Sequence, residues 1–108
     1  MKPLDLEAML EMQRALQEKY QDRWTKLSPQ SACRTLLWMI GEVSEAADIL
    51  KKNGEDQVMQ PGPVRAHFIE ELCDVLMYFG DVLLCFGIDP QTFCEAYVQK
   101  HQRNMNRW

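Results

Sequence analysis

The sequence of 108 residues predicts an all-α protein, a four-helix antiparallel bundle completed by oligomerisation. Two observations predict this fold class. Apolar residues recur three or four positions apart in four segments, which is the period of amphipathic helices, and stretches containing proline or glycine separate these segments. Short connections favour antiparallel neighbours, and bundles of this kind build their sites from side chains on facing helices. We therefore expect any chemistry of this chain to lie between helices.

The first two helices are predicted in the N-terminal half. From Leu6 to about Tyr20, apolar residues keep a helical period, and acidic residues come early, as the helix dipole favours. Ser28-Pro29 then supplies an N-cap residue and a proline suited to the first helical position. The second helix is expected from about Pro29 to Lys52, before Asn53-Gly54, which has the backbone preference of a helix end.

The second half of the chain predicts two more helices. Residues 55–63 are polar and contain two prolines, so they are expected to form a connecting loop. Residues 64–86 are apolar on more than one face, which is typical of a central helix packed by several neighbours. Gly87 ends this helix, and Asp89-Pro90 begins a fourth that continues to about Arg107.

The composition indicates one globular domain over residues 1–108, with 46% hydrophobic and 26% charged residues. The net charge of -4 argues against binding to a nucleic-acid polymer, which requires a basic surface. The N-terminus lacks the apolar stretch of a signal peptide, and no apolar run reaches the length of a membrane span. We expect a cytoplasmic protein without membrane contact. Its many apolar helix faces predict an oligomer.

Two acid pairs, Glu42-x-x-Glu45 and Glu71-x-x-Asp74, carry most of the functional argument. Residues three apart on a helix share one face, and no lysine or arginine follows any of these four acids at the salt-bridge spacing of four. For the first pair, a solvated helix face remains an equally good explanation. On the apolar third helix, burial of Glu71 and Asp74 would be costly without a compensating charge. Together the four carboxylates predict a Mg²⁺ site that keeps positions open for water and substrate phosphates.

The two acid pairs are followed on the last helix by Lys100-x-x-Arg103-Asn104-x-x-Arg107. This ordered set resembles the MazG-like nucleoside triphosphate pyrophosphohydrolases of the all-α NTP pyrophosphatase superfamily. The resemblance covers roughly residues 34–108 and is closest to the small single-domain members, including the dCTP pyrophosphatase group. It implies Mg²⁺-dependent hydrolysis of a nucleoside triphosphate, deoxy or modified, to the monophosphate and pyrophosphate, in cleaning the nucleotide pool. It also implies a dimer or a dimer of dimers.

The resemblance also implies roles for individual residues. The implied metal ligands are Glu42, Glu45, Glu71 and Asp74, and the implied phosphate contacts are Lys100, Arg103, Asn104 and Arg107. Either Glu45, as the first candidate, or Glu42 would accept the proton of the attacking water.

Two aromatic residues lie one helical turn from the acids. Trp38 and Tyr78 either stack on the base of the substrate or belong to the core, which is the commoner place for an aromatic residue on a buried helix. Trp24, in the segment before the second helix, is the more exposed candidate for a nucleotide pocket. The alternative function is a non-enzymatic helical dimerisation or interaction module with a structural metal site. Such a module would have no need for the basic residues of the last helix.

Overall fold

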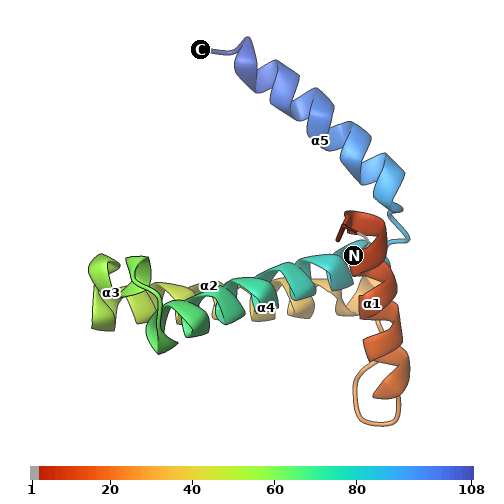
Figure 1. The fold of residues 1–108 in the computed structure, drawn as a ribbon. Coiled ribbons are helices and arrows are strands. Elements are labelled where there is room, and N and C mark those ends of the chain that lie inside the picture. The colour runs from red at the N-terminus through yellow and green to blue at the C-terminus, as the bar shows by residue number, and fades with distance from the viewer. Residues whose placement is uncertain (1–2) are drawn as a thin grey trace.

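The computed structural model describes residues 3–108, and over this range the protein is all-helical, as predicted (Figure 1). The elements are α1 (Leu6–Lys19), the 3₁₀ helix η1 (Pro29–Ser31), α2 (Ala32–Asn53), α3 (Glu55–Met59), α4 (Pro63–Cys85) and α5 (Pro90–Met105). The four predicted helices are therefore all present, with ends close to those expected. The second begins as a 3₁₀ turn and continues as α2.

Side-chain caps mark the beginnings of α5 and α1, and of these two only the cap at Asp89 was predicted. The Asp89 carboxylate accepts a hydrogen bond from the Thr92 backbone N–H at 2.7 Å, and Asp5 does the same for Ala8 at 2.8 Å. Helix α2 ends at Gly54. The φ of this residue is 83°, which is strained for a residue with a side chain.

The connector after Gly54 differs from the prediction, because it contains the short helix α3 rather than an open loop. Glu55 and Asp56 lie in the first turn of this helix, where their negative charges interact favourably with the helix dipole. Pro63 then begins α4. The connector is therefore short and structured, and it turns the chain so that α4 runs back along α2.

Helices α2 and α4 form an antiparallel pair at the centre of the molecule, and α1 crosses α4 near the end of that helix (Figure 1). Gly80 lies at this crossing, where a Cβ atom would be 3.4 Å from side-chain atoms of Leu10 and Gln13. Leu10 is completely buried at the crossing. The other buried apolar residues are Ala32, Ala46, Ile49, Leu83 and Cys85.

Helix α5 extends away from the central pair (Figure 1). It stays in contact through its first turns, where the Phe93 ring packs edge-on against Phe79 at a centroid distance of 5.1 Å. Within one chain the four long helices therefore do not lie side by side along their lengths. The prediction that the third helix is packed on most sides is wrong for a single chain, since Ile69, Leu72 and Leu76 remain almost half exposed.

Within residues 3–108, no helix combines the length and the apolar character that crossing a membrane requires.

A candidate metal centre between α2 and α4

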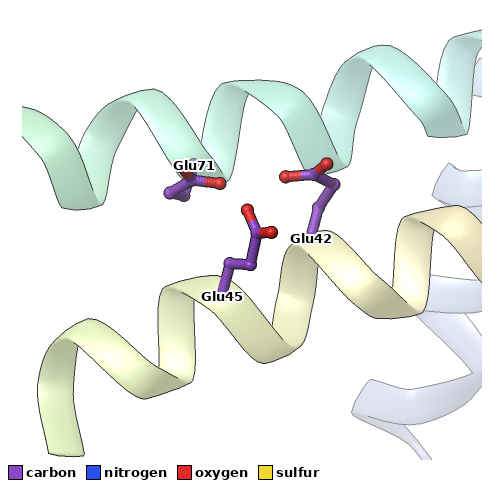
Figure 2. Close-up of side chains that lie close together, drawn as sticks. All are labelled: Glu42, Glu45 and Glu71. Carbon is purple, nitrogen blue, oxygen red and sulfur yellow. The ribbon is translucent and has the colours of Figure 1, made fainter.

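Three carboxylates meet between the two central helices, as Figure 2 shows. Glu42 and Glu45 extend from one face of α2, and Glu71 extends toward them from α4. One oxygen from each side chain can be chosen so that all three lie within 4.8 Å of one another. The antiparallel pairing of α2 and α4 thus brings together three of the four predicted metal ligands.

Asp74, the fourth predicted ligand, lies one turn after Glu71 on α4 and is not part of this group of three. It is near enough for its charge to contribute to a raised pKa at Glu42. Burial, together with the charges of Glu71 and Glu70, raises the pKa of Asp74 itself. Asp74 also lines a cavity beside the group, so it is close both to Glu42 and to that cavity.

The three glutamates influence one another's ionisation. Burial, a hydrogen bond with Glu71 and repulsion from Glu45 raise the pKa of Glu42 from 4.5 to about 7. The pKa of Glu71 is lowered, first because Glu42 donates to it and also because His67 Nε2 lies 3.2 Å from its Oε1. A proton on Glu42 thus reduces the repulsion between the carboxylates.

The donor set fits a hard divalent cation. With the three glutamates ionised, Glu71 Oε2 is buried without a hydrogen-bond donor among the described residues, and a buried acceptor without a partner is costly. In residues 3–108 the group has no ion pair with lysine or arginine, and its only cationic neighbour is His67 when protonated. Carboxylate oxygens are the ligands that Mg²⁺ prefers. A cation held by the three glutamates would satisfy the unpaired oxygen and offset their charge.

A cavity of about 440 Å³ lies next to Glu42, Glu45 and Glu71, which we call the acid group. It lies between α1, residues 23–31, α2 and α4. This volume is within the range of small-molecule sites. The predicted aromatic residues Trp38 and Tyr78 both line it, with ring centroids 6.2 Å apart, and Trp24 lines it as well. Trp38 is half exposed, so it is not a core residue of the single chain. The Arg34 guanidinium lies over its ring at 5.2 Å.

The cavity also contains a polar cluster that the sequence did not predict. Asp81 is 5% exposed, and its carboxylate accepts hydrogen bonds from Gln13 Nε2 at 2.9 Å and Gln17 Nε2 at 3.4 Å. Burial raises the pKa of Asp81, and these hydrogen bonds partly oppose that shift. The two glutamines come from α1, so only the tertiary fold reveals the cluster. His67 was also missed, although its position four residues before Glu71 could have indicated the contact.

The predicted phosphate-binding residues lie elsewhere. Together they line a shallow hollow on the last turns of α5, which extends away from the acid group (Figure 1). They are Lys100, Arg103, Asn104 and Arg107. A single chain therefore does not bring the basic and acidic halves of the predicted site together.

Comparison of the chain with models of protein families, with curated proteins and with solved structures found no match. The resemblance to the MazG-like enzymes therefore rests on the ordered motifs of the sequence. The convergence of Glu42, Glu45 and Glu71 is a separate observation, because it depends on the packing of α2 against α4.

Proposed function

We propose that the protein is a Mg²⁺-dependent nucleoside triphosphate pyrophosphohydrolase, which releases a nucleoside monophosphate and pyrophosphate. The observation that carries this proposal is the group of three carboxylates beside an aromatic-lined cavity. Such a site can hold a metal at one end and a flat heteroaromatic ring at the other. A nucleotide has both requirements, because its phosphates bind metal and its base stacks on aromatic side chains.

Each side chain has a defined part in this proposal. Glu42, Glu45 and Glu71 would hold Mg²⁺, and Asp74, which lines the cavity, would be the fourth ligand. When bound, Mg²⁺ neutralises charge on the triphosphate and favours attack of water at phosphorus.

The reaction also needs a base. Water attacks the α-phosphorus, the bond to the bridging oxygen of the β-phosphate breaks, and pyrophosphate leaves. Glu45 is the most exposed of the three glutamates and is the first candidate to accept the proton of the water, with Glu42 the second. Trp38 and Tyr78 orient the substrate by contact with its base.

A second copy of the chain would complete the site. The central helices expose an apolar stripe that nothing in one chain covers, made up of Leu36, Ile40, Val43 and Leu50 on α2 and Ile69, Leu72 and Leu76 on α4. Exposed apolar surface of this extent is typical of an interface between subunits. We propose that a homodimer, or a homotetramer built from it, buries this stripe and forms a four-helix bundle. The α5 helix of one subunit would then bring Lys100, Arg103, Asn104 and Arg107 to the phosphates bound by the other.

The second candidate function is a non-enzymatic dimerisation module with a structural metal site. The exposed apolar stripe favours it, because association alone would account for that surface. Metal binding and dimer formation are expected under both functions, so only turnover separates them.

Incubation with a panel of canonical and modified nucleoside triphosphates and Mg²⁺ tests the proposal. Monophosphate and pyrophosphate are the expected products, from at least one member of the panel. Release of diphosphate and inorganic phosphate would indicate a different hydrolysis. If every triphosphate remains intact, the non-enzymatic function replaces the enzymatic one.

A further inference from the structure

The cavity beside the acid group contains one deeply buried charged residue, Asp81. It is 5% exposed, and two other buried polar residues, Gln13 and Thr35, line the same cavity. Buried polar groups are usually paired, and the groups that remain free decide what a ligand can bind. The hydrogen bonds of these residues therefore indicate the chemistry of the ligand.

The buried wall of the cavity is rich in hydrogen-bond acceptors. Gln13 and Gln17 each commit an N–H to the Asp81 carboxylate, and the Thr35 hydroxyl donates to the Ser31 carbonyl oxygen at 3.1 Å. The carboxylate keeps further lone pairs, as do the Thr35 hydroxyl and the two amide oxygens, while each glutamine amide keeps one further N–H. In the part of the chain that the structure describes, no lysine, arginine or histidine forms an ion pair with Asp81.

The cationic residues of the cavity lie at its exposed side. Arg23 and Arg34 both line it, but both are exposed, and Arg34 lies over the Trp38 ring. The cavity therefore has an acceptor-rich buried part and a cationic, aromatic outer part. A ligand that fits has a flat ring with a hydrogen-bond donor on one edge.

We propose that Asp81, held by Gln13 and Gln17, selects nucleobases with an exocyclic amino group over their keto counterparts. Cytosine is thus preferred to uracil, and adenine to hypoxanthine. An amino group donates to the carboxylate, whereas a keto oxygen in its place would face the carboxylate as acceptor against acceptor and form no hydrogen bond with it. Sites built to bind a particular donor reject analogues that lack it strongly. This inference rests on the proposed function for the identity of the ligand as a nucleotide.

Binding of free nucleosides without metal tests the inference. Cytidine with uridine, and adenosine with inosine, form matched pairs that differ in the amino or keto group. Titration calorimetry, with quenching of the tryptophans that line the cavity as a second signal, should give at least about a tenfold lower Kd for the amino member of each pair. Equal affinities within both pairs, or no nucleoside binding at all, would overturn the inference.

Asp81→Asn tests the role of the carboxylate, because it keeps the side-chain size and replaces one acceptor with a donor. It should lower the preference to about threefold or less, mainly by improving binding of the keto members. Glu70→Gln, an exposed change on the same helix, should retain the full preference. A purely structural Asp81 would alter the affinity for both members alike and leave the preference unchanged, which contradicts the proposal.

The wild-type protein provides a second test if Asp81→Asn does not fold. Cytidine with a dimethylated amino group has no donor there and should lose the advantage over uridine, and a retained advantage would refute the role of Asp81. None of these measurements requires hydrolysis. Base preference without any pyrophosphate release would therefore overturn only the proposed enzymatic function, and pyrophosphate release without base preference would overturn only this inference.

Discussion

Glu42 on α2 and Glu71 on α4 face each other across the central helix pair, with carboxylate oxygens within 4.8 Å (Figure 2). The two residues are far apart in the sequence, and the turn through α3 brings their helices together. Burial, the contact with Glu71 and the charge of Glu45 together raise the pKa of Glu42 to about 7. This contact has consequences for stability, metal binding and activity.

Without divalent cations, we expect the free energy of unfolding to fall as the pH rises from about 4.5 to about 7. The pKa of Glu42 is raised over this interval in the folded protein, so the folded state binds its proton more tightly than the unfolded state. That contribution is fully present below the unfolded pKa and is lost as the pH rises through the folded pKa. Thermal unfolding at a series of pH values, with a chelator present, measures it.

Glu42→Gln is the matched comparison for this pH dependence. It cannot titrate, so its stability should fall less over the same interval. Asp74 and Asp81, whose pKa values are also raised, act in the same direction in both proteins. The pKa of Glu71 is lowered, first by Glu42, so Glu71 acts mainly below about pH 4.5, and the difference between pH 4.5 and 7 reports Glu42. An equally steep fall in the variant would show that Glu42 is not responsible.

Mg²⁺ should stabilise the folded protein. A ligand at about 100 times its Kd adds roughly 2.7 kcal/mol to the free energy of unfolding, which for a domain of this size raises the Tm by on the order of 10 °C. Glu71→Gln should abolish most of this shift, because it removes the ligand from α4. Glu70→Gln removes the same charge from an exposed neighbour and should keep the shift. Equal shifts in both variants would place the metal elsewhere.

The helices could be predicted from the sequence because their signals are local. Apolar periodicity and the cap at Asp89 depend on neighbouring residues, and the observed ends follow them closely. The acid pairs could also be predicted, since spacing along a helix fixes their common face. The position of α5 and the Asp81 cluster could not. Both depend on contacts between segments that are far apart in the sequence, and the pattern of neighbouring residues carries no information on such contacts.

The exposed apolar stripe predicts self-association that a single charge should weaken. Ile40→Glu places a carboxylate in the middle of the stripe, where Ile40 is 57% exposed in one chain. Sedimentation should then show the monomer mass at concentrations where the wild type is a dimer or tetramer, because burial of an unpaired charge is costly. Met59→Glu, on α3 and outside the stripe, should leave the mass of the assembly unchanged. A wild-type protein that is itself monomeric would refute the proposed interface.

The proposal that α5 acts across the subunit interface predicts complementation between inactive variants. Glu71→Gln impairs the acid group, and Arg103→Ala impairs the basic residues of α5. In a random mixture of the two, only dimers that contain one chain of each type have an intact site. About a quarter of the wild-type activity should therefore return after mixing and reassembly. No recovery, with reassembly verified by mass, would show that each chain uses its own α5.

The central claim is that the carboxylates between α2 and α4 form the hydrolytic site, and the activity of Glu71→Gln beside Glu70→Gln tests it most directly. The measurement is pyrophosphate release from the best triphosphate of the panel, with saturating Mg²⁺ and with folding verified by circular dichroism. We predict a loss of about 100-fold or more for Glu71→Gln and activity close to wild type for Glu70→Gln. Wild-type activity in folded Glu71→Gln, or an equal loss in both variants, would contradict the claim.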